Sequence, residues 1–127
     1  MCDFNEYVVS SLAKTWIFDL DGTLLKHNGY KLDGIDSWLP GAREFLCKIP
    51  ENDMIIFLTS RTEEYRKLTI DFLQNSKVRY NEIIFNAPYG ERVLVNDKKT
   101  SGMKTAIAVN TQRDIFMEQK FIIDEDL

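Results

Sequence analysis

Two aspartates, Asp19 and Asp21, stand two residues apart directly after a short apolar run and are the residues best placed to do chemistry. The run at 15–20 predicts a buried strand, and Gly22 predicts a sharp turn immediately after the acids. Because side chains alternate along a strand, both carboxylates are expected on one face. Two negative charges so close repel each other unless a cation or a proton lies between them. The pair is therefore suited to binding a cation or to acid–base work, whereas Asp-Gly alone would indicate only a solvated turn.

A second group with chemical potential follows the apolar run at 54–58, where Thr59, Ser60 and Arg61 precede a predicted helix. A strand that is apolar at every position is typical of a parallel sheet covered on both faces. Small hydroxyl residues where such a strand meets a helix predict a phosphate-sized site, because helix N-termini attract anions. Arg61 could clamp an anionic substrate there, or it could be an exposed charge in the first turn of the helix.

A third carboxylate, Asp97, ends a predicted strand at 92–97. The carboxyl ends of parallel strands meet at one edge of a sheet, so we expect Asp97 to lie beside Asp19 and Asp21. Carboxylate oxygens are the ligands that Mg²⁺ prefers. The sequence therefore predicts a Mg²⁺ site held by these three aspartates, where the metal would let a carboxylate approach an anionic phosphate.

Strands and helices alternate along the chain, which predicts an α/β fold of the Rossmann-like, three-layer α/β/α type with a parallel central sheet. The expected helices and later strands lie at 40–49, 63–75, 83–85, 92–97 and 106–109. The segment 21–39 has three glycines and no sustained period, so we expect a flap after the first strand and no cap domain. Residues 7–9 could form a short edge strand or a helical turn, and the last residues could return over the core or pair at an edge.

The string D-x-D-G-T-L at 19–24 resembles the first motif of the haloacid dehalogenase-like superfamily, whose members with both aspartates are mostly phosphatases. This resemblance implies that Asp19 is the nucleophile, forming an aspartyl-phosphate, and that Asp21 is the general acid and base. It implies that Thr59 hydrogen-bonds the transferring phosphoryl group and that Asp97 holds the Mg²⁺. The resemblance covers roughly residues 15–110.

The chain departs from the family pattern in two places. Asn96 stands where the fourth motif often has a second acid, and Ala87 stands where related small phosphatases of surface-polysaccharide gene clusters carry a lysine. That lysine neutralises the phosphate, and such a contact can contribute several kcal/mol in the transition state. We expect Lys98 to replace it, because Lys98 adjoins Asp97. The alternatives for this charge are Arg92, Lys99 and Arg61.

The composition, with 44% hydrophobic residues and a formal net charge of −4, is that of an ordinary globular domain. At 127 residues, a single domain spanning 1–127 is expected. No apolar stretch approaches 18 residues and no signal-peptide pattern is present, so we expect a cytoplasmic protein without membrane contact. Two cysteines are too few for a disulfide framework. The chain has no basic stripe, which argues against nucleic-acid binding.

These features predict a small, capless, Mg²⁺-dependent phosphatase. Its expected substrate is a small phosphomonoester, such as a sugar phosphate or a phosphorylated polyol or amino alcohol, and the family resemblance suggests a role in capsule biosynthesis. Because capless relatives are often oligomers, a homo-oligomer is expected. Contacts with the substrate are expected from Gly22, Ser60, Arg61 and Arg92. Two alternatives stay open: a phosphatase acting on phosphoproteins or nucleic-acid ends, and a binding module that kept the fold without turnover.

Overall fold

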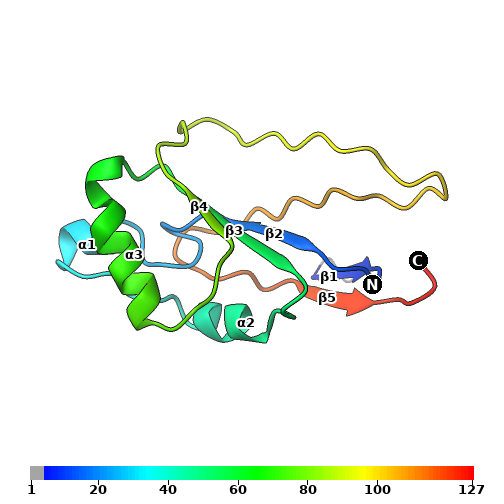
Figure 1. The fold of residues 1–127 in the computed structure, drawn as a ribbon, viewed down its shortest axis with the longest axis horizontal. Helices are drawn as coiled ribbons and strands as arrows, with labels where there is room; N and C mark the ends of the chain where they lie inside the picture. Colours follow the sequence, from blue (N-terminus) through cyan, green and yellow to red (C-terminus); the bar gives the residue numbers. More distant parts are fainter. Residues whose placement is uncertain (1–4) are drawn as a thin grey trace. The chain divides into compact units, whose positions relative to one another are not determined.

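The chain forms two compact units, each with its own parallel sheet (Figure 1). The computed structural model describes residues 5–127. The larger unit, here called the core unit, is made of residues 13–89 and 111–117. The smaller, here called the terminal unit, is made of residues 5–12, 90–110 and 118–127 of the described chain. The single domain predicted for the whole chain stays a prediction.

Three parallel strands form the sheet of the core unit, in the order β2 (Thr15–Phe18), β3 (Met54–Leu58) and β4 (Glu82–Ile84). Most of their residues are β-branched or aromatic, the types that pack well on a pleated surface. The register places Phe18 beside Phe57, and Phe57 beside Ile83, so these side chains share one face of the sheet. That face is buried against the rest of the core unit, whereas Ile17 and Ile84, on the opposite face, are each about half exposed.

Helices α2 (Ala42–Lys48) and α3 (Arg66–Asn75) each connect one of these strands to the next. A 3-10 turn, η1 (Glu63–Tyr65), leads into α3. Both helices contribute to the same core cluster, α2 through Leu46 and α3 through Leu73. The alternation of parallel strands and helices makes this a Rossmann-like α/β fold, as the sequence predicts.

The hydrophobic core extends into the segment that follows β2. Leu20, Leu24 and Leu25 are fully buried there, although the sequence indicates a flap over most of this region. Full burial of a leucine side chain contributes roughly 1.5–3 kcal/mol. The segment 21–39 is largely irregular, as predicted, apart from the one-turn helix α1 (Gly29–Leu32). Its leucines nevertheless build it into the core, so it is not a detached lid.

A buried carboxylate outside the predicted site, Asp53, anchors the start of the sheet. Its two oxygens accept hydrogen bonds from the Lys14 backbone N–H and the Trp16 indole N–H, each at 3.0 Å. Asp53 is only 6% exposed, so both bonds offset the cost of burying its charge. The role of Asp53 is therefore structural.

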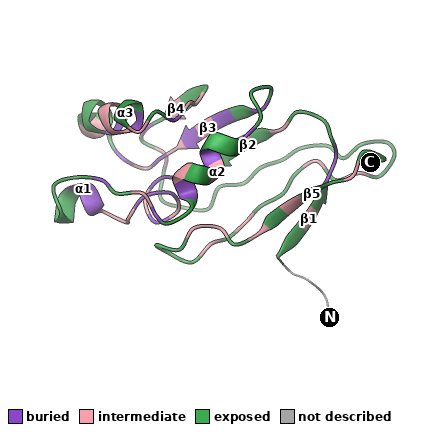
Figure 2. Ribbon diagram, turned by 90° about the horizontal axis from the view of Figure 1, so that it is seen from below, coloured by how far each residue is buried: buried purple, intermediate pink, exposed green. Residues whose placement is uncertain are grey.

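Two of the predicted strands, at 92–97 and 106–109, are absent from the structure, and those predictions are wrong. Residues 91–100 are exposed throughout, with Val93 82% and Val95 87% exposed (Figure 2). Strand preference reflects packing against neighbouring strands more than an intrinsic preference of the backbone. The apolar run at 93–95 joins neither described sheet, so its sequence pattern has no structural effect there.

The two ends of the chain pair in the terminal unit. Strand β1 (Glu6–Val9) runs parallel to β5 (Lys120–Ile123), and the ring of Tyr7 stacks on that of Phe121 with centroids 5.5 Å apart. Residues 7–9 therefore form a short strand and not a helical turn, and the last residues pair at a sheet edge. Within residues 5–127, no helix has the length and apolar character needed to span a bilayer.

Candidate active site

The turn after β2 holds Asp19 and Asp21 at the carboxyl end of the strand. Three backbone N–H groups of this turn donate to the carbonyl oxygen of Leu20 at 3.0–3.2 Å, from Thr23, Leu24 and Leu25. The Thr23 hydroxyl also donates to Asp19 Oδ2 at 3.1 Å. Because Leu20, Leu24 and Leu25 belong to the hydrophobic core, packing of these side chains fixes the turn. The sequence thus places both carboxylates on a rigid support.

Gly22 lets the chain turn immediately after the acids. Its φ of 81° lies in the left-handed region, and its N–H donates to the Leu25 carbonyl at 2.7 Å. A β-carbon at Gly22 would lie 3.2 Å from Arg113 Cγ and 3.7 Å from His27 Nδ1. The N–H of Gly22 is therefore used within the turn, and its contact with substrate stays a prediction.

Replacing Gly22 by alanine is expected to lower the free energy of unfolding by about 2 kcal/mol. Left-handed backbone costs a residue with a β-carbon about 1–2 kcal/mol, and the new methyl group would also press on Arg113. Gly34→Ala is the matched control, because Gly34 has a similar φ of 77° but open space around it. Urea unfolding of both variants measures the difference, and an equal cost for the two would show that the contact at Gly22 is unimportant.

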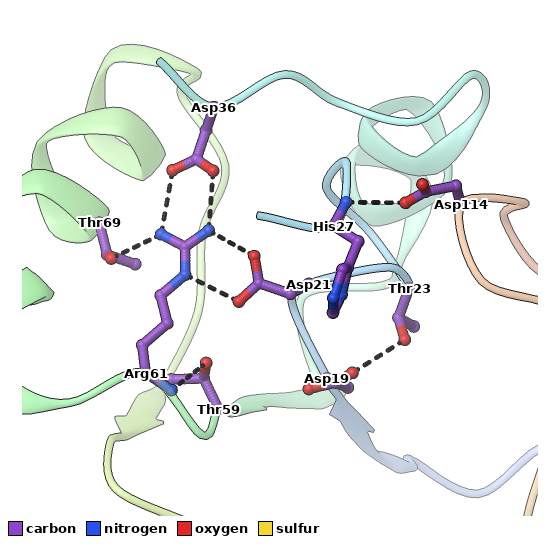
Figure 3. A network of polar contacts seen from close by, with 9 residues as sticks. All are labelled: Asp19, Asp21, Thr23, His27, Asp36, Thr59, Arg61, Thr69 and Asp114. Atoms are coloured by element: carbon purple, nitrogen blue, oxygen red, sulfur yellow. Dashed lines mark hydrogen bonds and ion pairs between the residues drawn. The ribbon is translucent and has the colours of Figure 1, made fainter. Parts of the chain in front are cut away.

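Arg61 links the turn after β2 to the segment after β3 (Figure 3). Its Nε and Nη2 donate to the two oxygens of Asp21, at 3.0 and 2.9 Å. Its Nη1 and Nη2 donate to the two oxygens of Asp36, at 3.0 and 2.7 Å, and Nη1 also donates to the Thr69 hydroxyl at 2.8 Å. A guanidinium has five N–H donors. All five are therefore occupied by these partners.

Burial makes this cluster costly unless it is fully paired. The side chains of Arg61 and Asp36 have no exposed surface, and that of Asp21 is 18% exposed. Desolvation alone would lower the pKa of Arg61, but the hydrogen bonds and charges of Asp36 and Asp21 outweigh it and raise that pKa above its usual value. The Arg61 guanidinium therefore stays charged, held between two carboxylates.

The alternative interpretation, in which Arg61 is an exposed charge in the first turn of the helix, is wrong, because the residue is only 3% exposed. A direct clamp on substrate stays a prediction, and it would require at least one of the five bonds to be released. The ring of Tyr30 lies against the guanidinium, with its centroid 4.1 Å from Arg61 Cζ. Desolvation, and next the charge of Asp21, raises the pKa of Tyr30, so its phenol is neutral at ordinary pH. Tyr30 thus covers the arginine with an uncharged face.

Thr59 and Ser60 occupy the end of β3, as predicted. The Thr59 hydroxyl accepts a hydrogen bond from the Arg61 backbone N–H at 3.1 Å, and Thr59 is 1% exposed. Its backbone carbonyl accepts from the Ala87 N–H at 3.0 Å, which fixes the segment after β4 beside it. The Ser60 hydroxyl makes a long contact, 3.4 Å, with the Pro88 carbonyl. Phosphate binding by these hydroxyls stays a prediction.

The remaining predicted site residues belong to the terminal unit. They are Arg92, Asp97 and Lys98. Since Asp19 and Asp21 belong to the core unit, the predicted meeting of three aspartates stays a prediction. No group of three or more His, Cys, Asp or Glu side chains that could hold a metal ion occurs within residues 5–127.

The donor atoms of the turn after β2 suit a hard cation, because they are oxygens. Both oxygens of the Asp21 side chain are bonded to Arg61, so the candidate Mg²⁺ ligands of this turn are the Asp19 carboxylate and main-chain carbonyl oxygens. Magnesium usually keeps several waters and needs only one or two carboxylates. The donor set of this turn therefore fits Mg²⁺ in kind, and binding of the ion stays a prediction.

Sequence reasoning missed Asp36, Thr69 and Asp114. Asp36 lies in the segment interpreted as a flap, and Thr69 lies in the helix predicted at 63–75, where it accepts a hydrogen bond from Arg61 eight residues earlier. Asp114 accepts a hydrogen bond from the His27 backbone N–H at 2.7 Å, across 87 residues of sequence. No sequence motif marks these residues, because their roles depend on contacts made in the folded chain.

Comparisons with known proteins add one structural likeness. No family model matches the chain, and no curated protein matches it. Among solved structures, a chain of the "Structure of Pnkp1/Rnl/Hen1 complex" is similar, with a TM-score of 0.51 and 26% sequence identity. The similarity covers 67% of this chain and 32% of that one, so this protein corresponds to about a third of its neighbour's length.

Proposed function

We propose that the protein is a phosphatase that hydrolyses a phosphomonoester by covalent catalysis at Asp19. The observation that carries this proposal is the bidentate bond between Asp21 and Arg61, which ties the turn after β2 to the segment after β3 at 2.9 and 3.0 Å. Two of the three strand ends that the sequence singled out are thereby joined. The likeness to a chain of the Pnkp1/Rnl/Hen1 complex supports a function in phosphoryl transfer.

In the proposed reaction, a carboxylate oxygen of Asp19 attacks phosphorus and the ester P–O bond breaks. The leaving oxygen takes a proton from Asp21. Water then attacks the phosphorus of the aspartyl-phosphate while Asp21 takes a proton from that water, the bond from the Asp19 oxygen to phosphorus breaks, and inorganic phosphate leaves. The Thr59 hydroxyl, at the end of β3, would hydrogen-bond the phosphoryl group. Bound Mg²⁺ would neutralise charge that develops on the phosphoryl oxygens.

The Arg61 bonds set a condition on this mechanism. Both oxygens of Asp21 accept hydrogen bonds from the guanidinium, and an oxygen that carries a proton for the leaving group cannot accept in the same way. Asp21 must therefore release at least one of these bonds before it donates. The Asp21 side chain is 18% exposed, which leaves space for that movement, whereas the Asp36 side chain has no exposed surface.

The proposed substrate is a small phosphomonoester such as a sugar phosphate or a phosphorylated polyol or amino alcohol. A role in capsule biosynthesis is part of this proposal and rests on the family resemblance of the D-x-D-G-T-L string. A second candidate is the phosphorylated end of a nucleic acid, which the likeness to a chain of the Pnkp1/Rnl/Hen1 complex favours. Cleavage of a phosphorylated oligonucleotide but of no phosphorylated metabolite would select the second candidate.

Asp19→Asn is expected to lower turnover of a chromogenic phosphate ester in Mg²⁺ by at least about 10³-fold, because an amide cannot act as the nucleophile. Asp33→Asn is the matched control, since Asp33 is an acid of the segment after β2 whose side chain is 45% exposed. The control should keep its activity. Equal turnover by the Asp19 variant and the parent protein would contradict the proposal, and no turnover by the parent protein would favour a binding module.

A further inference from the structure

The segment 111–117 returns to the core unit and lies beside the turn that carries the candidate catalytic acids. The backbone N–H of Asp114 donates to the Gly22 carbonyl at 2.8 Å, and its carboxylate accepts from the His27 N–H (Figure 3). Phe116 packs on Phe45 of α2, with ring centroids 5.5 Å apart. The segment is thus fixed at both its polar and its apolar residues.

These anchors hold Arg113 against Gly22. A β-carbon built on Gly22 would meet Arg113 Cγ at 3.2 Å, so the aliphatic part of the arginine covers the turn directly after Asp21. Arg113 is exposed, and its guanidinium makes no hydrogen bond or ion pair with any other residue of the described range 5–127. The Arg113 side chain therefore lies against the acidic turn, and its guanidinium has no hydrogen-bond or ion-pair partner within residues 5–127.

Several other cations of the core unit already have partners. All five N–H donors of Arg61 are occupied, as described above. Lys26 binds Asp33 at 2.8 Å, and Arg66 binds Glu63 at 2.6 Å. Lys98, which the sequence suggested as the cation for the phosphate, belongs to the terminal unit. Arg113 is the core-unit cation whose side chain the structure places against Gly22.

A phosphate that approaches two carboxylates is repelled unless positive charge lies close to it. A guanidinium suits this role, because its planar donors bind two phosphate oxygens at once and it stays charged at any physiological pH. We propose that Arg113 binds the anionic phosphoryl group of the ligand beside the turn at Asp19–Gly22. This inference rests on the proposed function and assigns to Arg113 the neutralising role that the sequence suggested for Lys98.

Because Arg113 is exposed and contacts the turn through its aliphatic part, its charge contributes to ligand binding and little to folding. Removal of the charge should therefore raise KM more than it lowers kcat. Salt should weaken this contribution, since exposed charges are screened over about 10 Å at 0.1 M ionic strength. A purely structural role would instead appear as a change in unfolding without a change in salt dependence.

The test measures the affinity of the full chain for inorganic phosphate in the presence of Mg²⁺ by titration calorimetry. Arg113→Met keeps the aliphatic contact with Gly22 and removes the charge, and Arg113→Lys keeps the charge without the bidentate fork. Hydrogen bonds to charged groups contribute about 1.5–3 kcal/mol, so Arg113→Met should bind phosphate about 10- to 100-fold more weakly. Arg113→Lys should lie between that variant and the parent protein.

Two controls separate a site from a general change in charge. Lys48→Met removes an exposed charge at the end of α2, and Lys77→Met removes an exposed charge just after α3. Both should bind phosphate within about twofold of the parent protein. Arg113→Met binding as tightly as the parent, either control losing as much as Arg113→Met, or a parent protein that binds no phosphate would each overturn the inference.

The same variants distinguish this inference from the proposed function. Phosphate binding that depends on Arg113 in a protein without ester turnover would support the inference and contradict the phosphatase. Turnover that depends on Asp19 but not on Arg113, in KM or in phosphate affinity, would leave the phosphatase supported and overturn the role of Arg113.

Discussion

Replacing Asp36 by asparagine is expected to lower the free energy of unfolding by about 3–5 kcal/mol. Asp36 and Arg61 have no exposed side-chain surface, and Asp36 accepts two of the five guanidinium donors, at 2.7 and 3.0 Å. An amide at this position brings its own N–H group toward those donors and removes the negative charge. The arginine is then buried with less compensation, and that penalty is what makes broken buried ion pairs costly.

Asp33→Asn provides the contrast for this prediction. Asp33 also pairs with a cation, Lys26, at 2.8 Å, but the two side chains are 45% and 43% exposed. Exposed ion pairs contribute only about 0–1 kcal/mol. Urea unfolding of both variants measures the difference, and a loss below about 1 kcal/mol for Asp36→Asn would contradict a stabilising role for the buried pair.

A second comparison separates the charge from the packing. Replacing Arg61 and Asp36 together by methionine and leucine removes the two fully buried charges and keeps much of the volume, and such replacements are often neutral in stability. The Asp21 carboxylate, which is 18% exposed, remains. The double variant is therefore expected to be more stable than Asp36→Asn. It should nevertheless lose activity, because Asp21 would have lost the guanidinium that positions it.

Replacing Asp21 by asparagine is expected to lower kcat for a phosphate ester by about 10²- to 10⁴-fold, the range typical of lost acid–base catalysis. The loss of free energy of unfolding should be smaller than for Asp36→Asn, because the Asp21 side chain is 18% exposed and water can hydrate the polar groups left without a partner. We therefore expect the two carboxylates that hold Arg61 to differ in role: Asp36 would stabilise the fold, and Asp21 would act in the proposed reaction.

Measurement of kcat and of unfolding on the same preparations tests this difference in role. Asp36→Asn serves as the reference for stability and Asp33→Asn for activity. A kcat for Asp21→Asn within about threefold of the parent value would contradict the acid–base role. A stability loss larger than that of Asp36→Asn would show that Asp21 is mainly structural.

The two hydrogen bonds from Arg61 also fix the orientation of the Asp21 carboxylate. A carboxylate held by two charge-assisted bonds keeps one orientation, and it can exchange one of those bonds when a ligand enters. The Tyr30 ring lies against the guanidinium, and the Thr69 hydroxyl accepts one of its hydrogen bonds, so Arg61 has contacts that do not involve Asp21. In the proposed mechanism, Arg61 would therefore be a positioning residue.

The sequence by itself determined the local elements of the core unit. Strand β3 has the bounds predicted from its apolar run, and β2 begins at Thr15 as predicted but ends at Phe18, two residues before the predicted end. The helix after Thr59 was also predicted, as was the turn at Gly22. These features are encoded locally, because strand runs, helix periodicity and glycine turns depend on residues close together in the chain.

Pairing across the chain was decided by the tertiary structure alone. The apolar run at 93–95 has the composition of a strand but stays exposed, whereas β1 and β5 pair across more than a hundred residues. A strand forms only where a neighbour accepts its backbone groups, and the run itself does not say whether such a neighbour exists.

The chemical setting of the site was likewise decided by tertiary contacts. From the sequence, Arg61 was a clamp or an exposed charge, and in the structure it is buried between Asp21 and Asp36. Arg113 lies ninety-one positions after Gly22 in the sequence, yet its side chain rests on that glycine. Local sequence determines which groups can react, but burial and charge partners are properties of contacts between distant segments, so only the folded chain decides them.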